Sequence, residues 1–123
     1  MKDDKTLENL LDLDGIKMVI DEKLGLWVKF EVSVTSLSVR PNGIRYSLSL
    51  HDQHGHRIIG FDNAHEIEYG PKRMVAPKRT FDHWHFNEND EGRPYDYVTA
   101  GRLMEDFWVE VEKRLTLLRG DKK

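Results

Sequence analysis

The sequence predicts an α+β domain in which an antiparallel meander of about five strands is covered on one face by a carboxy-terminal amphipathic helix. Two observations predict this fold. Between residues 28 and 61, short runs of alternating hydrophobic and polar residues are separated by glycine-containing turns, a pattern typical of half-buried strands. Over residues 100–118, hydrophobic residues recur at every third or fourth position, which is typical of an amphipathic helix.

Length and composition indicate one domain over residues 1–123. A chain of 123 residues can bury roughly two-thirds of its unfolded surface in a single core. The sequence contains no cysteine and no run approaching the roughly 20 apolar residues that cross a bilayer. It also lacks an amino-terminal apolar stretch that precedes a small-residue cleavage site. We therefore expect a cytoplasmic protein without a membrane segment.

The predicted sheet spans residues 16–86 and begins with a short strand at 16–20. A tight turn leads into a longer strand at 28–35, where hydrophobic and polar residues alternate. The turn sequence at 40–43 contains proline, asparagine and glycine, so the next alternating run, at 44–51, is expected to be its antiparallel partner.

Two further strands complete the predicted meander. The fourth covers residues 57–61, and the fifth covers residues 78–86. The connection at 64–78 is long for a small domain, which favours mobility or a role in covering a ligand. Because successive side chains of a strand point to opposite faces, we expect Asp82 not to contact its neighbour His83.

The final helix follows a polar loop at 87–94. Thr99 is a favourable N-cap, so the helical segment with its cap covers residues 99–118. Its hydrophobic stripe, which includes Phe107, is expected to pack on the sheet. Residues 1–13 form either a short acidic helix or a loose arm, and the sequence does not decide between the two.

Charge is distributed unevenly, although the formal net charge is only −3. Residues 1–22 carry three basic and seven acidic side chains, and residues 82–112 carry two basic and nine acidic ones. The segment at 69–81 is basic instead. Its ionised side chains are Lys72, Arg73, Lys78 and Arg79. Neighbouring cations attract phosphate groups; the alternative is an ordinary solvated loop.

Polar side chains gather at two places that the predicted topology puts on neighbouring strands. Asp62, Asn63 and His65 follow the fourth predicted strand, and His83 and His85 lie in the fifth. Imidazoles titrate near neutral pH, and carboxylates orient them or bind metals with them. The sequence therefore predicts that any reaction centre lies here, but it does not specify the reaction.

Six short motifs follow one another along the chain. They lie at residues 40–48, 55–57, 60–63, 82–85, 94–95 and 103–108. Taken in order, they resemble the TumE family of small bacterial and archaeal toxin-antitoxin proteins, and the resemblance covers about residues 16–115. It implies a toxin component that has a small helix-turn-helix antitoxin as its protein partner.

A toxin that cleaves RNA needs a general base, a general acid and cations around the phosphate. We assign the acid and base roles to His83 and His85, with Asp62 orienting an imidazole. Further residues are expected to contact the substrate, and no cofactor is expected. Phosphate stabilisation is assigned to Arg45 and Arg79, a hydrogen bond to substrate or loop backbone to Asn63, and additional contacts to His65 and Lys78.

Two other classes of function fit the same residues. In the first, the protein is a non-enzymatic binding module, and a basic antitoxin docks on the acidic surface of residues 82–112 and covers the histidines. In the second, His83, His85, Asp62 and His65 bind zinc or manganese in a metal-dependent hydrolase or nuclease. The simplest alternatives are a polar strand edge for the histidines and an ordinary turn for Asp62. The oligomeric state is left open between monomer and homo-oligomer.

Overall fold

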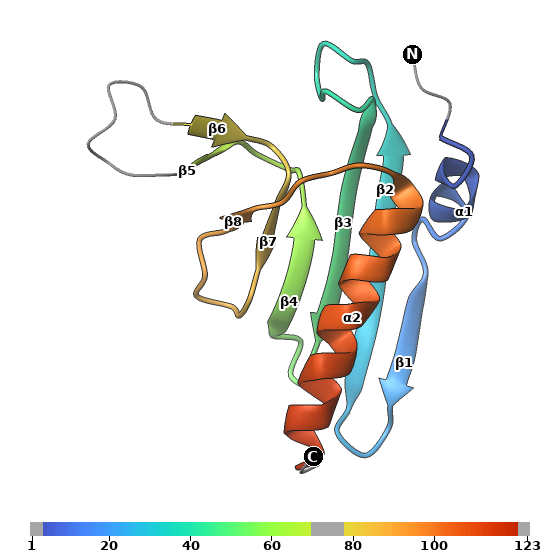
Figure 1. Ribbon diagram of the computed structural model, residues 1–123. Coiled ribbons are helices and arrows are strands. Elements are labelled where there is room, and N and C mark those ends of the chain that lie inside the picture. Colours follow the sequence, from blue (N-terminus) through green and yellow to red (C-terminus); the bar gives the residue numbers. More distant parts are fainter. Residues whose placement is uncertain (1–3, 70–77, 121–123) are drawn as a thin grey trace.

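The computed structural model describes residues 4–69 and 78–120. Its main sheet has six antiparallel strands, and each strand pairs with the next one in the order β1-β2-β3-β4-β7-β8 (Figure 1). The expected meander with a helix on one face is thereby confirmed. The strands are β1 (Lys17–Asp21), β2 (Leu26–Val34), β3 (Ile44–His51), β4 (Arg57–Asp62), β7 (His83–His85) and β8 (Arg93–Pro94).

Helix α2 (Ala100–Leu118) lies along one face of this sheet (Figure 1). It begins where the sequence predicts, because the hydroxyl of Thr99 accepts a hydrogen bond from the backbone N–H of Arg102 at 3.1 Å. The buried residues of α2 recur at helical spacing and therefore form one stripe. They are Ala100, Leu103, Phe107, Val111 and Leu115.

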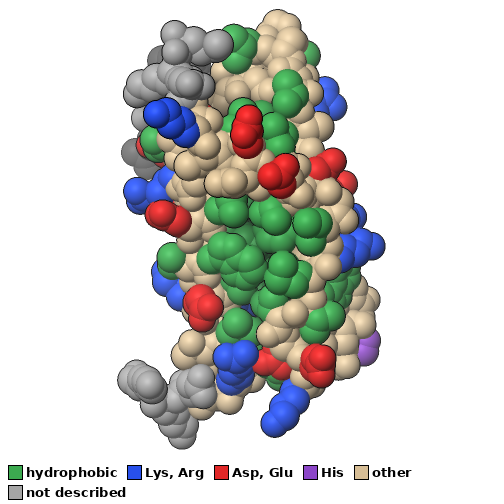
Figure 2. Space-filling model, turned by 90° about the vertical axis from the view of Figure 1, so that its right-hand side faces the viewer, with side chains coloured by type: hydrophobic (Ala, Val, Ile, Leu, Met, Phe, Trp, Pro, Cys, Tyr) green, Lys and Arg blue, Asp and Glu red, His purple; other side chains and the backbone are tan. Residues whose placement is uncertain are grey.

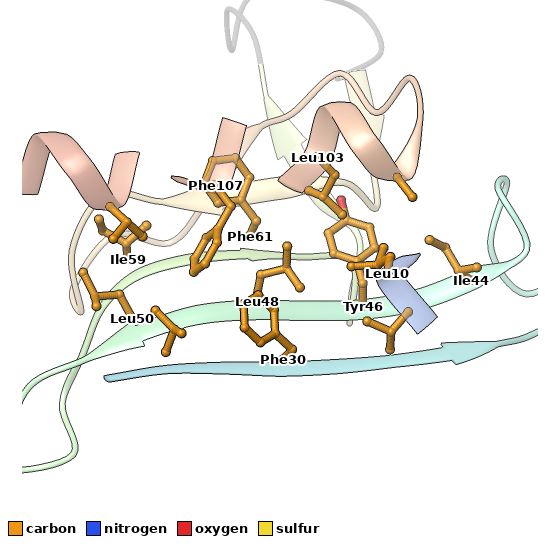
Figure 3. Close-up of a cluster of buried hydrophobic side chains, with 14 of the residues drawn as sticks. Leu10, Phe30, Ile44, Tyr46, Leu48, Leu50, Ile59, Phe61, Leu103 and Phe107 are labelled. Carbon is orange, nitrogen blue, oxygen red and sulfur yellow. The ribbon is translucent and has the colours of Figure 1, made fainter. Parts of the chain in front are cut away.

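The core lies between that stripe and the sheet face beneath it (Figure 3). The ring of Phe107 meets the rings of Phe30 and Phe61 edge-on, with centroid distances of 5.9 and 6.1 Å. Phe30 lies on β2 and Phe61 on β4. Leu48 lies on β3, the strand between them, and is fully buried. Burial of a Phe or Leu side chain contributes about 1.5–3 kcal/mol, so this contact fixes α2 on the sheet.

Among the described residues, the amino-terminal region contains a short helix, and the residues just before it cap α2. Helix α1 (Leu7–Leu11) buries Leu10 completely in the core. Just before it, a carboxylate oxygen of Asp4 accepts the N–H of Ala100 at 2.8 Å, and the hydroxyl of Thr6 accepts the N–H of Gly101 at 2.7 Å. These bonds satisfy backbone donors that a helix start leaves unpaired.

The sequence predicts one strand at 78–86, but the structure has two separate strands in this range. Residues 78–80 form β6 (Lys78–Thr80), which pairs with β5 (Ile67–Tyr69) in a separate two-stranded sheet, and the main sheet resumes at β7. The chain bends at Phe81, and the carboxylate of the next residue, Asp82, accepts a hydrogen bond from the hydroxyl of Tyr46 at 2.8 Å. Part of the predicted connection at 64–78 is therefore β5, and residues 70–77 lie outside the described part of the chain.

The side of the molecule that carries α1, α2 and the edge strand β1 has hydrophobic side chains gathered at its centre (Figure 2). A groove of about 790 Å³ lies between the α1 region and α2. Six of the residues that line it are Thr6, Asn9, Met104, Trp108, Val109 and Glu112. Among the described residues, no helix has both the length and the apolar character needed to cross a bilayer.

Candidate functional site

The pairing of β4 with β7 brings the two predicted polar clusters together. Asp62 lies opposite His83 in the register, and Phe61 lies opposite Trp84. Phe61 belongs to the core beneath α2, and side chains alternate along a strand. Asp62, His83 and His85 therefore lie on the sheet face that points away from α2.

Both imidazoles converge on one carboxylate. The Nε2 atom of His83 lies 3.1 Å from Oδ1 of Asp62, and the Nε2 atom of His85 lies 3.3 Å from Oδ2. The two rings are nearly perpendicular, with centroids 4.8 Å apart. We call Asp62, His83 and His85 the carboxylate–imidazole cluster. Asp82 points to the opposite face and contacts Tyr46, as strand alternation predicts.

The other nitrogen of each ring is held by a backbone carbonyl. Nδ1 of His83 lies 2.7 Å from the oxygen of Phe81, and Nδ1 of His85 lies 2.7 Å from the oxygen of Asp90. A carbonyl oxygen only accepts hydrogen bonds, so each Nδ1 carries a proton and donates it. In a neutral ring, Nε2 then has a lone pair and no donor to pair with, and it faces Asp62.

The cluster is covered by the loop that follows β7. His83 is 0% exposed and His85 is 4% exposed. Gly92 packs directly on both rings, since a Cβ atom built on it would lie 2.9 Å from Cδ2 of His83 and 3.4 Å from Cε1 of His85. The loop is tied down by the carboxylate of Asp90, which accepts the N–H groups of Phe86 and Gly92 at 3.0 Å each. A large substrate therefore does not reach these two rings directly.

His65 connects the cluster to the surface. Its ring is exposed, and its centroid lies 4.8 Å from that of His83. One ligand atom each from Asp62, His65 and His83 lies within 4.8 Å of the others. These three residues are the type of set that binds a metal ion, and His65 is their exposed member.

Electrostatics inside the cluster favour an ionised carboxylate. Burial alone would raise the pKa of Asp62, but the nearby rings of His83 and His85 and the hydrogen bond from the backbone N–H of Ala64 lower it to well below its ordinary value. Burial alone would lower the pKa of His83, but the nearby charge of Asp62 and the Phe81 carbonyl outweigh burial and raise the pKa of His83. Asp62 thus attracts a cation, whether a proton on His83 or a metal ion.

Asn63 is occupied by the backbone of the neighbouring strand. Its side-chain oxygen accepts the N–H of Tyr46 at 2.9 Å, and its side-chain nitrogen donates to the carbonyl of Ile44 at 2.8 Å. Of the two roles expected for Asn63, its geometry fits the hydrogen bond to backbone, because the side chain is buried. Asn63 directly follows β4, and its side chain ties the end of this strand to the backbone of β3. These bonds fix the position of the preceding residue, Asp62.

The predicted cations do not all lie at the cluster. Arg45 is exposed on β3 and lines a cavity of about 290 Å³ together with Ser47, which lies opposite Asp62 in the register. Arg79 is on the separate β5–β6 sheet, where its guanidinium pairs with Glu66 at 3.6 Å and with Glu68 at 3.2 Å. Lys78 starts β6, and its side chain lies outside the described part of the chain.

Sequence reasoning missed a cation that supports the site. The buried Arg40 donates to the carbonyls of Asn63 at 2.6 Å and Ala64 at 2.7 Å, and its guanidinium stacks on the Phe81 ring at 4.3 Å. It therefore connects the segments that carry Asp62 and His83. The signal in the sequence was a turn motif at 40–43, which accounts for the glycine and proline there but says nothing about an arginine that reaches across the sheet.

Comparison with known proteins assigns a family to this arrangement. The family model described as toxin TumE matches residues 19–115, which is most of the chain and includes the whole cluster. None of the curated proteins and none of the solved structures matches the chain.

Proposed function

The chain belongs to the TumE toxin family, and from this premise we propose that it is the toxin of a toxin-antitoxin pair that inhibits growth by cleaving RNA. The observation that carries the proposal is the convergence of two imidazoles on one carboxylate, at 3.1 and 3.3 Å. Imidazole and carboxylate groups are the kinds of side chain that act as general acid and base in phosphodiester cleavage.

The sheet face around the cluster supports an anionic substrate. Arg45 is diagonal to Asp62 on the neighbouring strand, since Ser47 lies directly opposite. Side chains in such diagonal positions are about 7–8 Å apart at their bases, a distance that an arginine side chain spans. Arg45 would bind the phosphate. The exposed His65 would contact the substrate, because the other two imidazoles are buried.

Arg79 has a different role in this proposal. Its charge is already paired with Glu66 and Glu68, and exposed pairs of this kind contribute only about 0–1 kcal/mol. A phosphate can therefore compete for it at small cost. Arg79 would attract the RNA backbone along β6, outside the reaction centre.

The antitoxin is proposed to bind the face opposite the cluster. Glu105 and Glu112, which belong to the acidic segment at 82–112, lie on α2, whereas the histidines lie on the other face of the sheet. A partner seated on α2 would therefore not cover the cluster directly. The groove between the α1 region and α2 is mostly apolar and is lined by Glu105 and Glu112 as well as Lys113, which would fit an apolar antitoxin segment with charged flanking residues.

The test combines growth with RNA cleavage. We would express the full chain with and without its antitoxin, measure growth, and incubate the purified protein with RNA. Asp62→Asn and His85→Gln should abolish both growth inhibition and cleavage, because each removes one partner from the cluster. His54→Gln is the matched control, because His54 is an exposed histidine on the turn between β3 and β4.

Circular dichroism would establish that each variant is folded. Folded Asp62→Asn and His85→Gln proteins that retain full toxicity would contradict the proposed site. Toxicity without RNA cleavage, lost in the same variants, would contradict the proposed reaction and support an interaction with another target.

A further inference from the structure

We propose that Asp62, His83 and His85, completed by His65, bind a divalent first-row transition metal such as Zn²⁺. The binding itself is argued from the geometry of the cluster, whereas its use in catalysis rests on the proposed function. A metal held here would supply the positive charge that phosphodiester cleavage needs, and with four protein ligands it would take up water only by expanding to five-coordination.

The first argument is the direction of the lone pairs. Both Nδ1 atoms donate to backbone carbonyls, at 2.7 Å each, which is the arrangement that fixes metal-binding histidines. Both Nε2 atoms are buried without a hydrogen-bond donor and point at Asp62. A lone pair facing a carboxylate is repelled, but a cation placed between the two is attracted by both.

The second argument is the spacing of the atoms. In a tetrahedral site with bonds of about 2.0–2.1 Å, neighbouring ligand atoms are about 3.3–3.4 Å apart. The Nε2 to carboxylate distances are 3.1 and 3.3 Å. The cluster is therefore close to the spacing that such an ion requires, and small shifts of the side chains would complete it.

The third argument is the fourth residue. His65 offers a ligand atom within 4.8 Å of those of Asp62 and His83, and its side chain is exposed, so it can move onto the ion. Three imidazoles with one carboxylate suit zinc and similar ions, whereas magnesium and calcium prefer sites made of oxygen atoms.

The experiment measures metal binding directly. The full chain is freed of metal with a chelator and then titrated with Zn²⁺ by calorimetry, and the melting temperature is measured with and without the ion. We expect one equivalent to bind and the melting temperature to rise. His65→Ala should weaken binding by at least about tenfold; it changes an exposed side chain, so folding is preserved. Asp62→Asn should weaken binding further.

The control concerns two other histidines of the chain. His54 and His56 lie on the turn that follows β3, and Nδ1 of His56 is 3.5 Å from a carboxylate oxygen of Asp52. His54→Ala and His56→Ala should leave Zn²⁺ affinity unchanged. If they weaken binding as much as His65→Ala does, the ion sits at that turn and the proposal is wrong. Absence of Zn²⁺ binding to the unsubstituted chain also overturns it.

Cleavage assays separate this inference from the proposed function. Zn²⁺ binding that is lost in His65→Ala, in a protein that cleaves no RNA, supports the metal site and removes the ribonuclease. RNA cleavage that persists in excess chelator, together with no binding at the cluster, supports the ribonuclease and removes the metal site. Cleavage that stops with chelator and returns with Zn²⁺ supports both.

Discussion

Gly92 lies so close to His83 that it admits no side chain: a Cβ atom at position 92 would be 2.9 Å from Cδ2 of the ring. The backbone of Gly92 also has a φ of +122°, a conformation that other residues rarely adopt. The loop after β7 therefore passes over the imidazoles at van der Waals contact. It holds both rings in the orientation in which Nε2 faces Asp62.

We predict that Gly92→Ala inactivates the site while the domain stays folded. The added methyl group displaces the ring of His83 and strains the backbone, at a cost of about 1–3 kcal/mol in the free energy of unfolding. Growth inhibition and Zn²⁺ affinity should both fall by at least about tenfold. Growth assays, calorimetry and urea unfolding of the purified variant measure these three effects.

Gly55→Ala is the matched control for this prediction. Gly55 also has a positive φ, of +84°, but a Cβ atom there meets nothing within 4 Å. The control should therefore show a similar loss of stability with unchanged toxicity and Zn²⁺ affinity. If the two variants lose toxicity equally, the effect of Gly92→Ala is general destabilisation and the contact with His83 is unimportant.

The sequence predicted the sheet well because the alternation of hydrophobic and polar residues is a local property of the chain. The strands at 44–51 and 57–61 and the helix after Thr99 follow directly from the spacing of hydrophobic residues. The meeting of Asp62 with His83 also followed, since it needs only two neighbouring strands whose polar residues share a face.

The parts that the sequence did not predict depend on contacts between distant segments. The separate β5–β6 sheet interrupts what reads as one strand, and the guanidinium of Arg40 connects two segments across the fold. The covering of the histidines by Gly92 likewise results from the path of the loop, whose polar composition indicates only a surface position. Neither the spacing of hydrophobic residues nor the secondary-structure propensity of single residues encodes such contacts.

His51, at the end of β3 away from the cluster, predicts a dependence of stability on pH. Burial against Trp27, on which its ring stacks at 4.3 Å, lowers the pKa of His51, and the charge of Lys29 adds to this. When the folded pKa lies below the unfolded value of 6.5, the unfolded chain takes up the proton first as the pH falls. The contribution of neutral His51 to the free energy of unfolding is therefore fully present above pH 6.5 and is lost as the pH falls below 6.5.

The comparison with His51→Gln isolates this contribution from other titrating groups. Between about pH 7.5 and about pH 5, the free energy of unfolding should fall more for the unsubstituted chain than for the variant. Urea unfolding at several pH values, without added metal, measures the difference. Parallel curves for the two proteins would show that His51 has the same pKa in the folded and unfolded chains.

The groove between the α1 region and α2 gives the last prediction, which separates antitoxin binding from toxicity. Val109 is 49% exposed and lines this groove on the face away from Asp62 and the histidines. Val109→Asp places a carboxylate where an apolar antitoxin segment would pack, and a buried unpaired charge costs several kcal/mol on binding. The variant should remain toxic, because the cluster is unchanged, but the antitoxin should no longer rescue growth.

Leu37→Asp is the control for Val109→Asp, because Leu37 is a 60% exposed hydrophobic residue in the loop between β2 and β3 and does not line the groove. Its rescue by the antitoxin should be normal. Size-exclusion chromatography of each variant with the antitoxin measures complex formation directly. If Val109→Asp leaves that complex intact and instead disrupts a dimer of the toxin, the groove binds a second copy of the chain. The antitoxin must then bind elsewhere, and the face that carries the cluster becomes the next surface to test.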